Sequence, residues 1–177
     1  YYKQYAQSFF GITMKKDGWD CLRHYEILAS GAIPYFYNID GLPAETMKTF
    51  PVEVVKKAMN LPGVPSERDV RRGKVQIDHS MFDIKQYCEI WRDLNKYTDE
   101  HLTTRQLAEY FLKEISAVHS HFSPEEAKVL MVSNRDIEYQ SGFLYFGLDD
   151  LIGERLSMLY GRKYCAYQKN LEGCYGR

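Results

Sequence analysis

The spacing of apolar and polar residues predicts a strand–helix–strand unit near the start of the chain. Residues 8–14 form a short apolar, β-branched and aromatic run, which is typical of a buried strand. Residues 19–30 place apolar side chains at helical spacing, and Gly31 follows as a natural helix end. Residues 32–37 form a second apolar run. Two strands joined by such a helix are expected to be parallel, with a right-handed crossover.

A helical wheel divides residues 19–30 into an apolar face and a polar face. The face expected to be buried carries Cys21, Leu22, Tyr25, Leu28 and Ala29, and the opposite face carries Trp19, Arg23, Glu26 and Ser30. The polar face therefore begins just beyond the carboxyl end of the first predicted strand. Ligands bind at that edge of open α/β sheets, and the start of a helix favours phosphate.

Charged residues around this helix start suggest a site for a phosphorylated ligand. Lys15, Lys16 and Arg23 would neutralise a diphosphate, and Glu26 would accept hydrogen bonds from sugar or ribose hydroxyls. The alternative is an ordinary ion pair between Arg23 and Glu26 on the helix surface, since the two are three residues apart. Spacing alone leaves both interpretations open.

The middle of the chain is predicted to be mostly helical. Residues 44–60 read as one or two short helices interrupted by Pro51. Residues 61–79 are rich in proline and glycine, and their charged run at 67–72 is more typical of a solvated loop than of a binding patch.

Two longer amphipathic helices are predicted after that loop, over residues 83–97 and 103–117. Ser80 with Asp83 and Thr103 with Gln106 are the expected N-terminal caps. The apolar stripes of the two helices are expected to pack together through Trp91, Leu94, Leu107 and Phe111.

The last part of the chain repeats the strand–helix–strand pattern. Residues 128–133 read as a strand, 139–152 as a helix and 155–160 as a second strand. The predicted fold class is therefore α/β, with Rossmann-like strand–helix–strand units and a helical connecting region. We expect one domain over residues 1–122 and the start of another over 123–177.

Composition narrows the functional classes. The 177 residues are 45% hydrophobic and 27% charged, as in an ordinary folded domain. Lys and Arg (23) nearly balance Asp and Glu (24), which argues against charge-driven binding of nucleic acid through Arg68, Arg71 and Arg72. Apolar runs are much shorter than the roughly 20 residues of a membrane helix, so no membrane span is expected in this chain.

Cysteine and histidine positions give little sign of a metal. Cys21 and Cys88 read as small core residues of helices, whereas Cys165 and Cys174 would form a disulfide or stay reduced, as in a cytoplasmic chain. His119 and His121 form an H-x-H without a nearby third ligand, so no metal is expected. The chain opens on Tyr1 with no targeting signal and ends on an incomplete pattern, so we expect a fragment of a longer protein, located in the cytoplasm.

The segment S-F-F-G-I-T-M, followed by R-H-Y-E-I-L-A-S-G-A-I-P-Y-F, resembles the donor-binding segment of exostosin-like and related GT-B glycosyltransferases. In that family the Glu of the motif contacts hydroxyls of a nucleotide-sugar, and nearby basic residues contact its diphosphate. The resemblance implies donor-binding roles for Glu26, Arg23 and Lys15. Gly18 stands where a second motif Glu is found in the family, which leaves a retaining or an inverting reaction open.

Residues 128–153 resemble the opening strand and helix of the N-terminal half of similar glycosyltransferases, with Glu138-Tyr139-Gln140 and Phe146-Gly147-Leu148 in place of the family's motifs. Tyr139 and Gln140 would face an acceptor or simply begin the helix. The resemblance implies transfer of a sugar from a nucleotide-sugar to a glycan or other acceptor, without a metal or other cofactor. The alternative is a non-catalytic, Rossmann-like module that binds a nucleotide or serves as a scaffold. The sequence does not identify catalytic residues.

Overall fold

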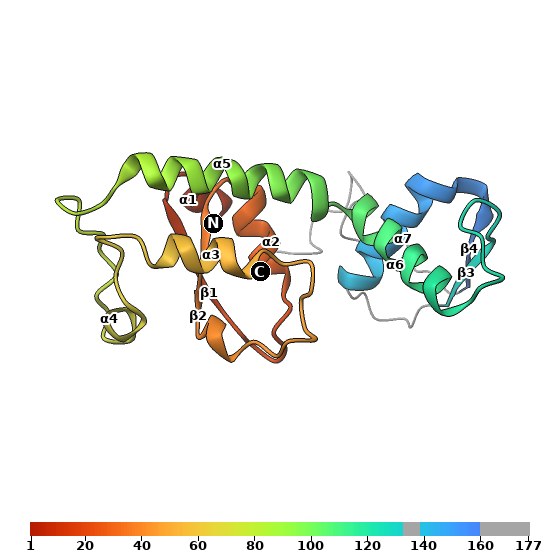
Figure 1. The fold of residues 1–177 in the computed structure, drawn as a ribbon, viewed down its shortest axis with the longest axis horizontal. Coiled ribbons are helices and arrows are strands. Elements are labelled where there is room, and N and C mark those ends of the chain that lie inside the picture. The colour runs from red at the N-terminus through yellow and green to blue at the C-terminus, as the bar shows by residue number, and fades with distance from the viewer. Residues whose placement is uncertain (133–138, 160–177) are drawn as a thin grey trace. The chain divides into compact units, whose positions relative to one another are not determined.

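The computed structural model describes residues 1–132 and 139–159. The chain divides into two compact units, the first unit at Tyr1–Leu102 and the second unit from Thr103 onwards (Figure 1). Each unit combines helices with a pair of short parallel strands, so the α/β class is confirmed at this coarse level. Cys165 and Cys174, for which the sequence analysis leaves a disulfide or reduced thiols open, lie outside the described residues.

Thirteen elements are found in the described part of the chain. The first unit contains α1 (Tyr2–Ala6), β1 (Phe10–Met14), α2 (Leu22–Ala29), β2 (Ile33–Tyr37), the 3₁₀ turn η1 (Ile39–Gly41), α3 (Val52–Met59), α4 (Glu67–Arg71) and α5 (Ile84–His101). The second unit contains α6 (Thr104–Val118), β3 (Val129–Val132), α7 (Tyr139–Ile152), η2 (Gly153–Arg155) and β4 (Leu156–Leu159).

Strands β1 and β2 are parallel, as the sequence predicts for the first strand–helix–strand unit. Phe10 lies opposite Ile33, and Met14 lies opposite Tyr37. Gly11 lets α2 come close to β1, because a Cβ atom there would lie only 2.8 Å from Cγ1 of Ile27. The side chain of Ile27 thus fills the space directly over the strand.

The buried face of α2 differs from the predicted one. The helix buries His24, Ile27 and Leu28, whereas Ala29 is exposed and Tyr25 is only half-buried. The predicted buried face included neither His24 nor Ile27. The ring of His24 is fully buried, since both of its nitrogens have hydrogen-bond partners.

The two long helices exist as predicted, and they belong to different units. Helix α5 packs on α2 and α3 through Tyr87, Ile90 and Leu94 (Figure 1), and α6 packs on α7 through Ala108 and Leu112. Of the four predicted contact residues, only Leu94 is buried, while Trp91, Leu107 and Phe111 are exposed. An amphipathic stripe predicts that a helix has a partner, but not which partner it has.

The caps of these two helices follow the prediction in part. Thr103 Oγ1 accepts from the Gln106 amide at 3.2 Å, as predicted. At α5 the N-cap is Asp83, whose Oδ1 accepts from the amides of Lys85 and Gln86. The hydroxyl of Ser80 instead donates to Asp78.

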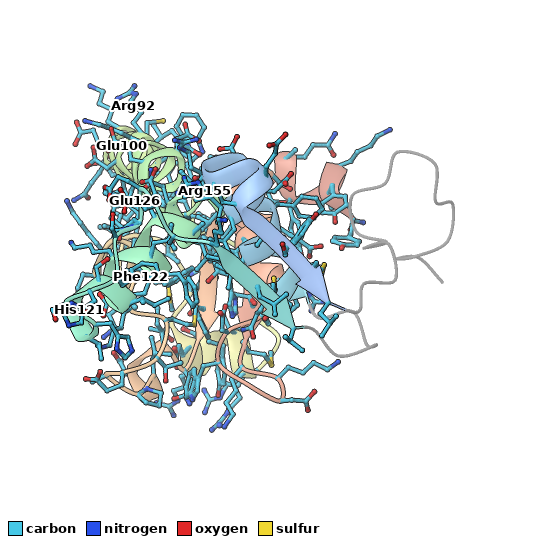
Figure 2. The ribbon with its side chains drawn as sticks, turned by 90° about the vertical axis from the view of Figure 1, so that its right-hand side faces the viewer. Arg92, Glu100, His121, Phe122, Glu126 and Arg155 are labelled. Atoms are coloured by element: carbon cyan, nitrogen blue, oxygen red, sulfur yellow. The ribbon has the colours of Figure 1, made fainter. Side chains whose placement is uncertain are left out.

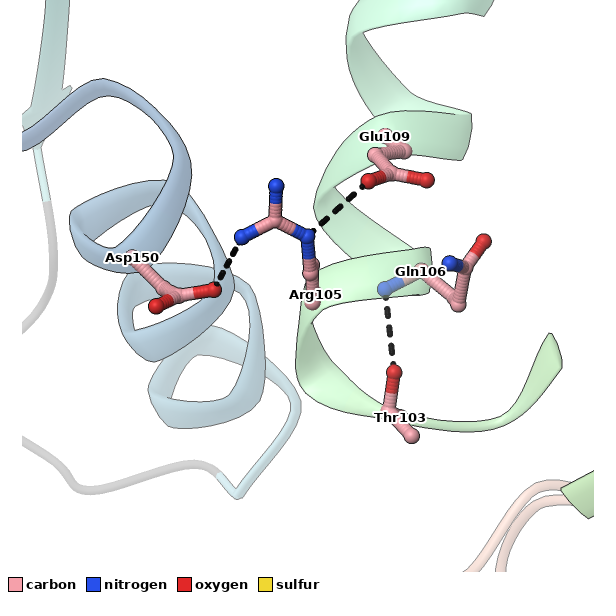
Figure 3. A network of polar contacts seen from close by, with 5 residues as sticks. All are labelled: Thr103, Arg105, Gln106, Glu109 and Asp150. Atoms are coloured by element: carbon pink, nitrogen blue, oxygen red, sulfur yellow. Dashed lines mark hydrogen bonds and ion pairs between the residues drawn. The ribbon is translucent and has the colours of Figure 1, made fainter. Parts of the chain in front are cut away.

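The second compact unit begins at Thr103, before α6, whereas the predicted boundary lies between residues 122 and 123. Helix α6 belongs to this unit because it packs on α7, and Arg105 links the two helices by an ion pair to Asp150 (2.6 Å). Arg105 also forms an ion pair with Glu109 within α6 (3.2 Å), as Figure 3 shows. These ion pairs are exposed, so they contribute little to stability compared with the buried contacts of Ala108 and Leu112.

Strands β3 and β4 form the second predicted parallel pair. Val129 lies opposite Leu156, and Val132 lies opposite Leu159. The guanidinium of Arg155, labelled in Figure 2, donates to the carbonyl oxygens of Pro124, Glu125 and Ala127. The start of β4 is thereby tied to the segment that leads into β3.

Within the described ranges, the helices are too short or too polar to cross a membrane.

Candidate functional site

The candidate site lies at the carboxyl ends of β1 and β2. Because Met14 and Tyr37 are partners in the sheet, the residues that follow them, Lys15 and Asn38, leave the sheet at the same edge. The loop after β1 leads into α2, whose N-cap is Cys21. The predicted position of the site, at a strand end next to a helix start, is therefore present in the first unit.

Lys15 and Trp19 form a cation–aromatic pair in the loop after β1. The Lys15 Nζ atom lies 5.5 Å from the centre of the Trp19 ring. The ring also packs against Gly41, where a Cβ atom would lie 3.2 Å from it. Trp19 thus joins the loop after β1 to the loop after β2, and Lys15 is exposed above it.

The buried side chain of His24 connects this loop to β1 and β2. Its Nδ1 lies 2.9 Å from Thr13 Oγ1 on β1, its Nε2 lies 2.8 Å from the carbonyl oxygen of Trp19, and its ring stacks on Phe36. A carbonyl oxygen only accepts, so Nε2 carries the proton and Nδ1 accepts from the Thr13 hydroxyl.

Burial lowers the pKa of His24, and the hydrogen bond to the Trp19 carbonyl opposes that shift only in part. The ring is therefore neutral at physiological pH. Sequence reasoning missed this residue. The spacing along the helix could have revealed His24. It precedes Ile27 by three residues and Leu28 by four, so all three lie on the face of α2 that meets the sheet.

Arg23 lies exposed in the first turn of α2. Within residues 1–132 and 139–159 no ion pair joins Arg23 to Glu26, so the interpretation of these residues as a surface ion pair is wrong. Arg23 stays near the helix start, where an anion would be favoured.

Glu26 lies one turn further along α2 and is half-buried. Its Oε1 atom accepts hydrogen bonds from the hydroxyls of Tyr1 (2.9 Å) and Tyr2 (2.8 Å). Hydrogen bonds with Tyr1 and with Glu26 raise the pKa of Tyr2 above its usual range. The three predicted site residues therefore lie along one segment, but each contacts different groups: Lys15 contacts a ring, Glu26 two hydroxyls, and Arg23 faces solvent.

Helix α4 contributes a second set of residues to this edge. Glu67 Oε1 accepts from the amide of Asn38 at 2.7 Å, and Asn38 has a left-handed backbone with φ of 61°. The guanidinium of Arg71 lies 6.0 Å from the centre of the Tyr37 ring. Residues 67–72, predicted to be a solvated loop, instead contain α4, whose Glu67 and Arg71 contact the end of β2.

A pocket of about 470 Å³ lies beside the loop that follows β2. Ile39 and Asp40 of η1 line it together with Phe50, Val54 and Tyr97. An ion pair between Lys56 and Asp40, 2.7 Å long, stands at its rim. The volume falls in the usual range of small-molecule sites.

Metal ligands do not cluster in the described part of the chain: no group of three or more His, Cys, Asp or Glu side chains there is arranged to hold an ion. His119 and His121 are both exposed, and Figure 2 labels the second. Comparison of the chain with protein-family models, with curated proteins and with solved structures finds no match.

Proposed function

We propose that the first unit is the donor-binding part of a glycosyltransferase of the GT-B type, which transfers a sugar from a nucleotide-sugar to a glycan or other acceptor. The observation that carries the proposal is the placement of Lys15 and Arg23 at the carboxyl edge of a parallel strand pair, next to the start of α2. This edge is the usual ligand site of an open α/β sheet. The resemblance of the segment to exostosin-like enzymes supports the same reading.

The start of α2 suits a diphosphate. Among the described residues, Cys21 gives no side-chain hydrogen bond to the amides of the first turn, and that turn contains no acidic residue. Amide groups without a side-chain cap and the positive end of the helix dipole both favour an anion. In this proposal Lys15 and Arg23 add two charge-assisted contacts to the phosphates.

Glu26 suits the hydroxyls of the donor. One of its carboxylate oxygens already accepts from two hydroxyls, those of Tyr1 and Tyr2. A ribose or sugar offers the same donors, so its hydroxyls would replace the two tyrosines. Residues 123–177, by their resemblance, would be the start of a further Rossmann-like unit.

Calorimetric titration of uridine, adenosine and guanosine diphosphates into the 177-residue chain tests the proposal. Arg23→Ala is expected to weaken the best-bound diphosphate about 10- to 100-fold, because a charged hydrogen bond contributes about 1.5–3 kcal/mol. Glu26→Gln is expected to weaken binding of the nucleotide but not of inorganic pyrophosphate. The melting temperature should change little, since Arg23 is exposed and Glu26 half-buried.

Arg92→Ala is the matched control, because Arg92 is an exposed arginine of the same unit on α5. It should leave the affinity unchanged. If Arg23→Ala and Glu26→Gln both bind diphosphate like the unmodified chain, the donor site is not at α2. A chain that binds the diphosphate but never releases sugar from a nucleotide-sugar would instead support a nucleotide-binding module without catalysis.

A further inference from the structure

We infer that the peptide bond between Lys74 and Val75 is a cleavage site for a protease that cuts after basic residues, and that the first unit stays assembled when this bond is cut. The inference does not depend on the proposed function. It is carried by the exposed chain between α4 and α5, by the basic residues that precede the bond, and by the contacts that hold α5 against the strands.

The chain between α4 and α5 contains a long exposed segment. Residues 71–81 are exposed apart from Ile77, which is half-buried, and residues 74–78 belong to no helix, strand or turn. Val75, the first residue after the proposed cut, is 47% exposed. Exposed segments of this kind are the usual places where folded chains are nicked, because a protease must surround several residues of its substrate.

Hydrogen bonds fix the two ends of this segment but not its middle. The Lys74 amide donates to the carbonyl oxygen of Asp69 at 2.9 Å, and the Asp78 amide donates to that of Gly63 at 2.8 Å. Within the described part of the chain, residues 75–77 form no hydrogen bond. The chain after the proposed cut can therefore become extended in a protease without loss of native hydrogen bonds.

Basic residues stand directly before the bond. Arg71 ends α4, Arg72 is its C-cap, and Lys74 is the first residue beyond the turn that follows. Helix α4 has five residues and none of them is buried, so its last turn can open at low cost. Proteases of the trypsin type hold one basic side chain in a specificity pocket with a carboxylate. Lys74 is best placed for that pocket, because it requires the least of α4 to open.

Other exposed basic residues lie in more ordered surroundings. The side chain of Lys96 is 75% exposed, but its backbone is in the middle of α5. Lys15 directly follows β1, and its Nζ atom lies over the ring of Trp19, whose carbonyl oxygen is bound by the buried His24. Exposure of a basic side chain is therefore not sufficient, and Lys74 differs because it begins a segment without regular structure.

Contacts across the proposed cut would keep the two pieces together. The cut places β1, α2 and β2 on one piece and α5 on the other. Three side chains of α5 donate hydrogen bonds to carbonyl oxygens of the first piece: Tyr87 to Phe9 (2.7 Å), Trp91 to Gly31 (2.7 Å) and Tyr97 to Thr49 (2.9 Å). Tyr87, Ile90 and Leu94 are buried in the same apolar cluster as Ile33 and Phe36. Burial of this apolar surface favours association of the pieces without a covalent link.

The new chain ends would remain hydrated. Hydrolysis adds the oxygen of water to the Lys74 carbonyl carbon and breaks its bond to the Val75 nitrogen, which leaves a carboxylate and an amino group. Both residues are exposed, so the cut buries no new charge.

Limited digestion of the 177-residue chain with trypsin, followed by mass spectrometry of the intact fragments, tests the inference. Among the bonds within residues 1–132 and 139–159, that between Lys74 and Val75 is expected to be cut first. Lys74→Gln should abolish this cut, because the specificity pocket of trypsin requires a basic side chain. Lys96→Gln is the matched control and should leave the rate of the cut unchanged, since Lys96 lies in the middle of α5.

Gel filtration in a reducing buffer tests whether the cut chain stays assembled. The piece that ends at Lys74 and the piece that begins at Val75 should elute together. Their tryptophan fluorescence should equal that of the uncut chain, because Trp19 and Trp91 lie on different pieces of one folded unit. A first cut elsewhere in the described ranges, for example after Lys15, would overturn the cleavage site. Separate elution of the two pieces would overturn the claim that the first unit stays assembled.

Discussion

Gly147→Ala is expected to destabilise the second unit by about 3 kcal/mol, because there is no room for a methyl group between α6 and α7. A Cβ atom at Gly147 would overlap the carbonyl oxygen of Thr104 and would lie 2.9 Å from the Cβ atom of Ala108. The carbonyl oxygen of Thr104 belongs to the backbone and cannot rotate away from the added methyl group, so the two helices would have to move apart. In an exposed helix the same substitution would stabilise by about 1 kcal/mol.

Urea denaturation followed by two signals measures this effect. Both tryptophans, Trp19 and Trp91, lie in the first unit, so tryptophan fluorescence should report an unchanged transition. The far-UV circular dichroism of Gly147→Ala should show that part of the helical signal is lost at a lower urea concentration than in the unmodified chain. Asp149→Ala is the control, since Asp149 is exposed on the same helix and should change stability by less than about 0.5 kcal/mol. A stable Gly147→Ala variant would mean that α6 and α7 are not packed this closely.

The local elements of this chain could be predicted because each follows from a short pattern. The apolar runs at 8–14 and 128–133 contain β1 and β3, and Gly31 ends α2 with φ of 81°, a conformation that glycine adopts without strain. The parallel pairing of both strand pairs followed from the helices between them. These features depend on residues that are near in sequence.

The packing between elements was harder to predict, because a helix stripe does not identify its partner. The predicted boundary at residue 122 separated α6 from α7, although Ala108 and Gly147 are in close contact across the two helices. Trp91 was predicted to lie in a helix interface, yet its Nε1 donates to the carbonyl oxygen of Gly31 and the residue is 38% exposed. Because the tryptophan side chain combines an apolar ring with a polar N–H group, it can donate this hydrogen bond and still remain partly exposed.

The candidate site could be predicted only where chain order determines it. Lys15 and Arg23 lie near the strand end because they come between β1 and the body of α2. The partners of Glu26 are Tyr1 and Tyr2, from a segment that no spacing rule connects to α2. Arg71 reaches the edge through the contact of Glu67 with Asn38, and a charged run alone does not encode such a contact.

Acidification is expected to destabilise the first unit through His24. Its pKa is lowered in the folded state by burial, whereas in the unfolded chain it titrates near 6.5. Below about pH 6.5 the unfolded chain therefore binds a proton that the folded chain does not bind until its lower pKa is reached. The free energy of unfolding should fall with pH in that window, by at most about 1.4 kcal/mol per pH unit for this one group.

His24→Gln tests this expectation because it removes the titrating group. It should cost about 2–4 kcal/mol at pH 7.5, since Thr13 Oγ1 and the Trp19 carbonyl lose well-placed buried partners. The difference in unfolding free energy between the unmodified chain and His24→Gln, followed by tryptophan fluorescence, should shrink as the pH falls from 7 towards 5. The remaining histidines, His79, His101, His119 and His121, are exposed and shared by both chains, so their effects cancel. A difference that stays constant with pH would mean that His24 takes up its proton at the same pH in the folded and the unfolded chain, so that burial does not lower its pKa.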